Sequence, residues 1–207
     1  MNPTQEMIKR LFLSIAISVA ALLAGTSSAA ADVTRCDGSL PAGTYDAVLV
    51  PEGETCNTGL GTVTVEGNVI LQEGASIRFL NCAATDCNHF IVIGNLLGDG
   101  VNLVFLDRGA SIAGHVSITG ATGEVTLRFV TIGGNLNISD SNGSRISVQD
   151  TTVNGNALFQ NNTVTTGPFR ISTIRIGGNL VCNGNDPAPV LQGTITVGGK
   201  RIGQCAQ

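Results

Sequence analysis

The sequence predicts an all-β protein: a single-stranded parallel β-helix, or solenoid, of about seven three-strand coils that follows a signal peptide. Two observations predict this fold. A Gly-polar-apolar step, most often Gly-Asn-Leu or Gly-Asn-Val, returns every 20 to 27 residues, and apolar residues alternate with polar ones between the steps. The repeated glycines are Gly67, Gly94, Gly114, Gly134, Gly155 and Gly178.

One period, residues 114–133, contains three short strand patterns. Apolar residues alternate with polar ones from Val116 up to a turn that is rich in glycine and threonine. Alternation resumes at Val125, reaches Phe129 and, after a bend, ends at Ile132. A helical solenoid is excluded because no stretch after residue 31 shows a 3.6-residue period. An antiparallel sandwich is the alternative, but it would not return one residue type at one offset in every coil.

Two sets of apolar residues predict the interior. A β-branched residue usually stands two positions before each repeated glycine, and a kept register places these side chains in one interior column. They are Val65, Val92, Ile112, Ile132, Val153, Ile176 and Val197. Phenylalanines recur nearly once per coil, several at inward positions, and predict aromatic stacking inside the coil. They are Phe79, Phe90, Phe105, Phe129, Phe159 and Phe169.

The asparagines of the repeated step predict a column at one corner of the coil. Stacked amides hydrogen-bond along such a column and satisfy turn backbone groups that no strand ladder reaches. A polar strip for a ligand is the alternative, and the structural ladder is preferred. The ladder residues are Asn68, Asn95, Asn135, Asn156 and Asn179. His115 takes the asparagine position of one coil, as a tolerated substitution rather than a catalyst.

The N-terminal residues have the pattern of a secretory signal peptide. Lys9 and Arg10 precede an apolar stretch, and small residues up to Ala31 offer a cleavage site. The stretch is shorter than the roughly 20 residues that span a bilayer as a helix, so no membrane span is expected. The product is expected to be secreted, periplasmic or on the cell surface. The predicted division is a signal peptide at 1–31, a lead-in at 32–44 and a β-helix at 45–205.

All six cysteines lie after the signal peptide. An even number in an exported chain indicates disulfides. A zinc site at the two central cysteines with His89 is the alternative, disfavoured because an oxidising compartment removes thiols and no Cys-x-x-Cys pair occurs. No metal or other cofactor is expected. Proximity in sequence favours the pairs Cys36–Cys56, Cys82–Cys87 and Cys182–Cys205.

Three parts of the chain resemble uncharacterised, secreted bacterial β-helix repeat proteins: residues 67–76, the Gly-Gly-Asn corners, and the C-terminal runs 178–185 and 197–205. The resemblance covers roughly residues 45–205, and the pattern of Cys182 and Cys205 is its most specific part. It implies a disulfide that closes the last coils, together with a fold and a location, but no activity. More broadly, the chain resembles pectin-lyase-like β-helices and the polymer-forming bactofilins.

Charge and acidic residues argue against two functional classes. The 207 residues carry a net charge of −4, whereas nucleic-acid binders usually show a strongly basic footprint. Pectate-lyase-type enzymes cluster acids from neighbouring coils around Ca²⁺. The acids here share no column and the coils leave no room for long loops, so no catalytic residue is assigned and an enzyme is disfavoured. These acids are Asp99, Asp107, Glu124, Asp140 and Asp150.

Two outward columns are binding candidates. Arginines recur about once per coil and suit an acidic polysaccharide, since guanidinium groups bind carboxylates. They are Arg78, Arg108, Arg128, Arg145 and Arg170. A hydroxyl column, interrupted by Arg175, resembles the flat rows of ice-binding solenoids, although threonine is common on exposed strands. It comprises Thr64, Ser111, Thr131, Thr152 and Thr196.

These observations together predict a non-catalytic secreted or cell-envelope β-helix with a structural or adhesive surface. The alternative is a protein that binds or cleaves an acidic polysaccharide through the arginine stripe. An extracellular or envelope polysaccharide is the expected partner, and no nucleic acid is expected.

Overall fold

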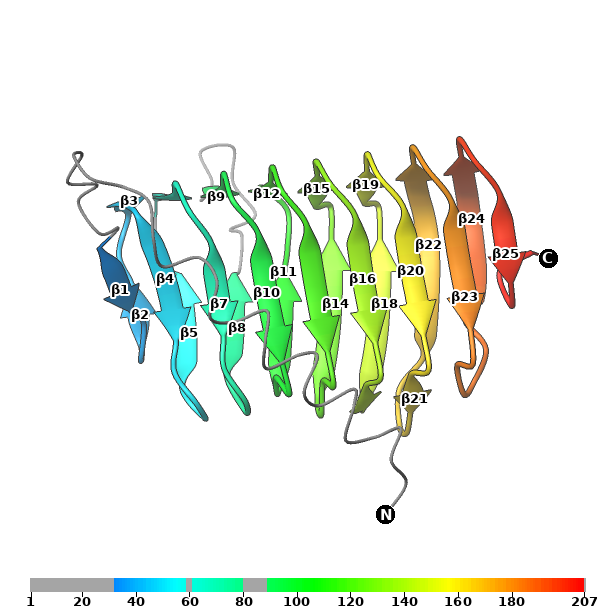
Figure 1. Cartoon of the computed structure of the whole chain (residues 1–207), viewed down its shortest axis with the longest axis horizontal. Helices are drawn as coiled ribbons and strands as arrows, with labels where there is room; N and C mark the ends of the chain where they lie inside the picture. The colour runs from blue at the N-terminus through cyan, green and yellow to red at the C-terminus, as the bar shows by residue number, and fades with distance from the viewer. Residues whose placement is uncertain (1–31, 59–60, 80–88, 207) are drawn as a thin grey trace, which may run out of the picture. The chain divides into compact units, whose positions relative to one another are not determined.

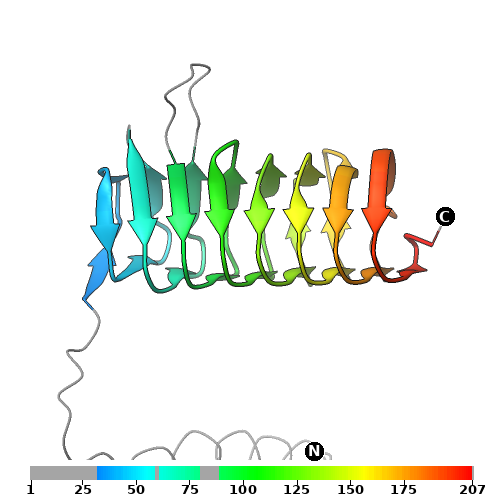
Figure 2. The same cartoon turned by 90° about the horizontal axis from the view of Figure 1, so that it is seen from above.

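The computed structural model describes residues 32–58, 61–79 and 89–206. In these ranges the chain is all-β, without a helix, and winds into a parallel β-solenoid of about seven turns (Figure 1). The predicted solenoid is therefore confirmed. Seen from above, the successive turns stack side by side along the long axis (Figure 2).

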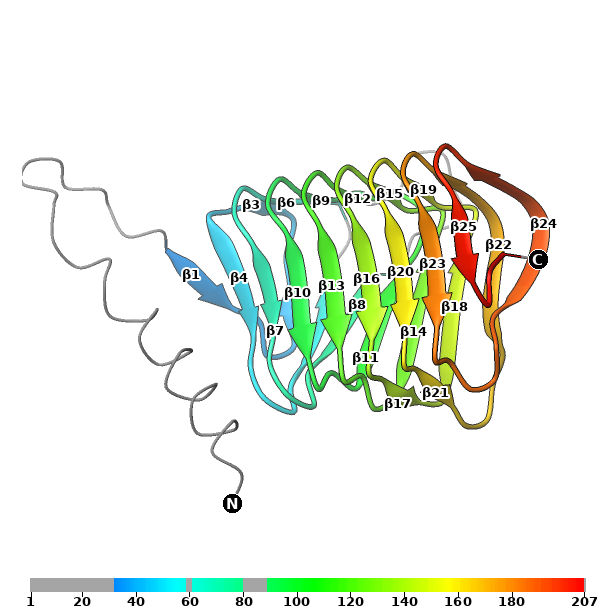
Figure 3. The same ribbon diagram turned by 45° about the vertical axis from the view of Figure 1, so that its right-hand side comes forward.

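One side of the solenoid is a nine-stranded sheet, in which each strand pairs in parallel with that of the next turn (Figure 3). Its strands are β1 (Val33–Arg35), β4 (Ala47–Val50), β7 (Val69–Leu71), β10 (Leu96–Asp99), β13 (Val116–Thr119), β16 (Leu136–Ser139), β20 (Ala157–Gln160), β23 (Leu180–Asn183) and β25 (Arg201–Gly203).

The second sheet has fourteen strands in two rows, and a long strand, β22, joins the rows. The first row holds β2 (Ser39–Leu40), β5 (Thr55–Thr58), β8 (Ser76–Phe79), β11 (Leu103–Leu106), β14 (Glu124–Arg128) and β18 (Arg145–Gln149). The second row holds β3 (Gly43–Tyr45), β6 (Thr62–Val65), β9 (His89–Val92), β12 (Ala110–Ile112), β15 (Thr131–Ile132) and β19 (Thr152–Val153). Strand β22 (Phe169–Ile176) runs through both rows and pairs with β24 (Val190–Val197), whereas β17 (Asn142–Gly143) and β21 (Thr163–Val164) form a small separate sheet.

The interior column predicted from the β-branched residues is confirmed. Strand pairing aligns Val65, Val92, Ile112, Ile132, Val153, Ile176 and Val197 in one register. All are buried except Val197, which is half-buried because it lies in the last turn. Alternate side chains of a strand point to opposite faces, so each of these strands turns its other residues outward.

The phenylalanines divide between the interior and the surface. Phe79 stacks on Phe90 with ring centroids 5.7 Å apart, and Phe159 meets Phe169 edge-on at 5.8 Å, all four inside the solenoid. Phe129 continues the apolar alternation of its strand in sequence, yet its side chain is 39% exposed. The reason is its backbone: at φ 55° the chain leaves the extended conformation and turns a corner there.

The asparagines of the repeated step lie one above another between the second row and the nine-stranded sheet, which we call the asparagine corner. The backbone N–H of Asn95 donates to Oδ1 of Asn68 at 2.8 Å, and the same 2.8 Å contact joins Asn156 to Asn135 and Asn179 to Asn156. His115 stands in the column between Asn95 and Asn135: its N–H donates to Oδ1 of Asn95 at 2.8 Å, and its Nδ1 accepts the N–H of Asn135 at 2.9 Å. Its ring is therefore held as part of the corner.

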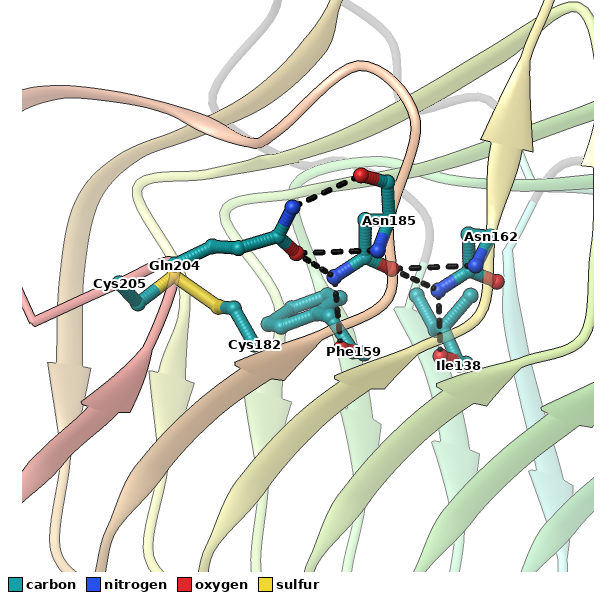
Figure 4. The surroundings of a disulfide bond; sticks show 7 residues. All are labelled: Ile138, Phe159, Asn162, Cys182, Asn185, Gln204 and Cys205. Atoms are coloured by element: carbon teal, nitrogen blue, oxygen red, sulfur yellow. Dashed lines mark hydrogen bonds between the residues drawn. A yellow bond between two sulfur atoms is a disulfide. The ribbon is translucent and has the colours of Figure 1, made fainter.

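A second amide ladder, which the sequence did not reveal, lies inside the C-terminal half (Figure 4). The side-chain amide of Asn162 donates to the carbonyl of Ile138 and to Oδ1 of Asn185, both at 2.9 Å. The amide of Asn185 donates in turn to the carbonyl of Phe159 and to Oε1 of Gln204. Buried polar groups need partners, and this ladder supplies them along the stacking direction.

Two disulfides lie near the ends of the described chain. Cys36 pairs with Cys56 and Cys182 with Cys205, with Cα atoms 5.3 Å apart in both. The expected Cys82–Cys87 pair lies outside the described residues, as does the predicted signal peptide. No helix in the described part of the chain is long and apolar enough to cross a membrane.

Candidate functional site

The five arginines of the predicted stripe lie on or beside the first row, but in different columns. Arg78 and Arg170 share a register column, with Phe105, Thr126 and Ser147 between them. Arg145 aligns instead with Glu124, and Arg128 aligns with Gln149. Arg108 extends over the ring of Phe129. The arginines therefore form no continuous row along the solenoid.

Acids neutralise the middle of this group. Arg128 donates from Nη2 to Oδ2 of Asp107 at 2.6 Å and from Nε to Oδ1 at 3.1 Å, and Arg145 lies 3.6 Å from Glu124. Burial raises the pKa of Asp107, but hydrogen bonds from Arg128 and the backbone of Arg108 outweigh it, and the pKa is lowered overall. The same bond, with the nearby charge of Asp150, raises the pKa of Arg128 despite burial. A polyanion would compete with carboxylates already bound.

The other acids considered in the sequence are dispersed. Asp99 ends a strand of the nine-stranded sheet, whereas Asp140 and Asp150 lie at two different corners. Within the described ranges, no three histidine, cysteine, aspartate or glutamate side chains come close enough to hold a metal ion.

The hydroxyl column runs along the outer face of the second row. Strand pairing aligns Thr44, Thr64, Ile91, Ser111, Thr131, Thr152, Arg175 and Thr196. Ile91 thus interrupts the column as Arg175 does, which leaves three consecutive hydroxyl residues in the middle. Backbone pairing on both sides fixes the spacing of these side chains at about 4.8 Å from turn to turn.

An open groove of about 330 Å³ begins at the C-terminal part of this column and reaches the corner between the two rows. We call the corner between the two rows the groove corner. Its lining comes from four successive turns: Phe129, Asp150, Thr151, Thr152, Thr173, Ile174, Arg175, Thr194 and Thr196. Four turns at strand spacing make a groove about 14 Å long, parallel to the solenoid axis.

The backbone at the groove corner is unusual. Phe129, Asp150 and Thr173 follow one another in successive turns with φ of 55°, 46° and 47°. Bulky and β-branched residues rarely adopt this left-handed conformation, which costs roughly 1–2 kcal/mol per residue. The adjoining turns place glycine at the same corner, Gly109 on one side and Gly193 on the other. Three consecutive turns therefore place a side chain at positive φ, with the larger strain at Phe129 and Thr173, and all three residues line the groove.

The groove combines three kinds of chemistry. Asp150 supplies a carboxylate, Arg175 a guanidinium group, and Thr152, Thr173 and Thr196 supply hydroxyls on the same surface. Phe129 supplies an aromatic ring, which is held by the guanidinium of Arg108 at 4.5 Å from its centroid. Donors, acceptors and an apolar ring side by side suit a ligand with both hydroxyl groups and C–H faces.

A second groove of about 350 Å³ lies on the nine-stranded sheet, beside the asparagine corner. Leu97, Ser117 and Asn137 form its floor, and His115 borders it. Most of its polar groups are already hydrogen-bonded within the asparagine column or to one another. Asn137, for example, donates to Ser117 at 3.5 Å. It is the weaker candidate.

Most groove residues belong to patterns that are visible in the sequence, but these patterns do not place them side by side. The sequence predicts one column for Thr152, Arg175 and Thr196, no shared column for Asp150, and an apolar alternation that ends at Phe129. Only the left-handed backbone at the corner turns Phe129 and Asp150 toward the column. Comparison of the chain with models of protein families, with curated proteins and with solved structures found no match.

Proposed function

We propose that the protein is a non-catalytic β-helix of the cell envelope or the extracellular space, whose rigid side surface serves adhesion or contact with a matrix. One observation carries the proposal: an in-register hydroxyl column leads into a polar groove with an exposed aromatic ring. Because the residues of this surface stand on paired strands and on the corners between them, the surface meets a partner without ordering a loop first.

The proposal includes export of the protein from the cytoplasm. The two disulfides are typical of proteins that fold in an oxidising compartment. The signal-peptide pattern at residues 1–31 and the resemblance to secreted bacterial β-helix repeat proteins support the same location.

Attachment under flow tests the proposed function. Beads coated with the purified protein are passed over surfaces coated with neutral polysaccharide, acidic polysaccharide or fibrous collagen. We expect shear-resistant attachment to at least one of them and no conversion of the polysaccharides. Beads that attach to none of the three surfaces, or release of soluble sugar products, would contradict an adhesive, non-catalytic role.

Binding or cleavage of an acidic polysaccharide is the second candidate. The observation that favours it is that Arg78, Arg108, Arg128, Arg145 and Arg170 lie on or beside one row of strands. Incubation with pectate, alginate and hyaluronan tests this function through the ultraviolet absorbance of unsaturated products and through retention at low and moderate salt. Retention that salt abolishes and that Arg128→Ala weakens supports it, since salt screens surface charges.

A further inference from the structure

The groove corner carries an inference that deepens the proposed adhesive function and rests on it. Three successive turns place a side chain at positive φ at this corner. In the turns on either side the link between the two rows is one residue longer, and there glycine takes the positive φ, at Gly109 and Gly193. In the three turns between them Phe129, Asp150 and Thr173 take it instead. What these residues add is side chains that project from the corner into the groove.

The charges of the lining indicate what kind of molecule fits. Asp150 and Arg175 are the only ionisable residues of the lining, and their charges cancel. Arg128 beside the corner is already bound to Asp107, and Arg108 lies against the ring of Phe129. A polyanion would approach the carboxylate of Asp150, which repels it. A neutral ligand meets an acceptor, a donor and several hydroxyls without such repulsion.

The shape of the groove and the exposed ring of Phe129 narrow the class of ligand further. The groove is open and follows the solenoid axis over four turns, so it suits an extended chain rather than an enclosed small molecule. Phe129 is 39% exposed, although burial would be favourable for a phenyl ring. An aromatic ring beside hydroxyl, carboxylate and guanidinium groups matches a sugar ring, which presents C–H groups on its faces and hydroxyls at its edge.

We propose that the groove lined by Phe129, Asp150, Thr152, Thr173, Arg175 and Thr196 binds the neutral sugar rings of a glycan chain. Phe129 packs against the C–H face of a ring, Asp150 accepts hydrogen bonds from ring hydroxyls, and Arg175 donates to ring oxygens. The threonines of the column contact the chain as it continues along the second row.

The corner itself supplies matched variants for a test. Asp150→Gly and Thr173→Gly each introduce glycine at a positive φ, which glycine adopts without steric cost, so the fold is kept while a groove side chain is removed. The control is Asp140→Gly, which removes an exposed carboxylate at φ 54° from the other left-handed corner, where Gly120 occupies the preceding turn. Arg175→Thr, with Arg78→Thr as its control, removes the guanidinium group from the column.

The probes are immobilised dextran, mannan and xylan as neutral glycans, and pectate as an acidic one. We expect the wild type to be retained on at least one neutral glycan, with little dependence on salt. Asp150→Gly and Arg175→Thr should each weaken that retention roughly tenfold or more, as loss of a charged hydrogen bond does. Asp140→Gly and Arg78→Thr should leave it unchanged. Thermal unfolding of each variant verifies that the fold is kept.

Three outcomes overturn the inference. Retention on a neutral glycan that survives both groove variants places the binding site elsewhere. Attachment to collagen or pectate alone keeps the adhesive function and removes the neutral glycan. Attachment to none of the surfaces removes both. The failure of the inference and the failure of the proposed function are thus told apart by which surface retains the wild type.

Discussion

The solenoid has two corners with left-handed backbone, and their residues differ. Between the nine-stranded sheet and the first row lies what we call the glycine corner, where five of seven turns use glycine and the others use aspartate or asparagine. Its residues are Gly53, Gly74, Gly100, Gly120, Asp140, Asn161 and Gly184. At the groove corner the central turns instead use Phe129, Asp150 and Thr173.

The difference separates structural from functional constraint. Glycine takes positive φ without a steric penalty, and aspartate and asparagine are the side chains that tolerate it best. At the glycine corner the two side chains also bind each other, since Asn161 donates to Asp140 at 3.1 Å. At the groove corner the strained side chains point into a groove instead. The side chains of the glycine corner thus bind each other, whereas those of the groove corner line a surface that is open to a ligand.

The largest effect is expected in the interior column, whose side chains stack from turn to turn inside the solenoid. Ile132 is fully buried, and Ile132→Asp places a charge in a dry core, which should prevent folding. Thr131→Asp, one residue earlier and facing outward, is the control and should fold. Circular dichroism and soluble yield measure the outcome. A soluble, cooperatively unfolding Ile132→Asp protein would show that the inward assignment is wrong.

The buried amide ladder beside the glycine corner gives the next largest effect. Asn162→Ala removes the side chain that bonds the backbone of Ser141 and Ile138 and the amide oxygen of Asn185. Leaving these buried groups unpaired should lower the free energy of unfolding by about 2 kcal/mol. Chemical denaturation measures the loss, with the exposed Asn154→Ala as control. Equal stability of the two variants would show that the buried amide ladder does not stabilise the fold.

A reciprocal exchange tests the comparison directly. Gly120→Thr should lower the free energy of unfolding by roughly 1–2 kcal/mol through backbone strain, because the added Cβ meets no clash, with its nearest neighbour at an ordinary contact distance of 3.6 Å. Thr173→Gly should raise it by about 0.5 kcal/mol, since relief of strain exceeds the entropy that glycine adds to the unfolded chain. Denaturant titration of both variants measures the signs. Destabilisation by Thr173→Gly would mean that the groove corner holds its threonine for stability.

The smallest effect concerns the ion pair beside the groove corner. The folded pKa of Asp107 lies below its ordinary value of 3.8, so its contribution to stability is complete above about pH 3.8. The contribution is lost as the pH falls further, through the folded pKa. Asp107→Asn should therefore flatten the acid limb of the stability curve slightly, as measured by thermal unfolding between neutral and strongly acidic pH. Parallel curves for the two proteins would count against a lowered pKa.

The repeat determined the solenoid because its signal is local and recurs. Val65, Ile112 and Ile132 return at one offset from a glycine, and only a stacked coil brings one offset to one column. The asparagine column could be predicted for the same reason, because its residues also return at one offset in the repeat. The cysteine pairs near the two ends followed from proximity in sequence, whereas the ladder of Asn162, Asn185 and Gln204 keeps no common motif and became visible only in the folded chain.

The groove was decided by tertiary structure. Alternation predicts the direction of a side chain only while the backbone stays extended, and a left-handed residue ends that alternation. By sequence parity Phe129 belongs to the interior with Leu127, but the stacked turns impose a corner after Arg128, which turns the ring to the surface. The same corner brings Asp150 next to the column that holds Arg175, 25 positions further along the chain. The sequence by itself thus determined the coil and its interior, while the position of each corner, and hence the groove, depended on how neighbouring turns pair.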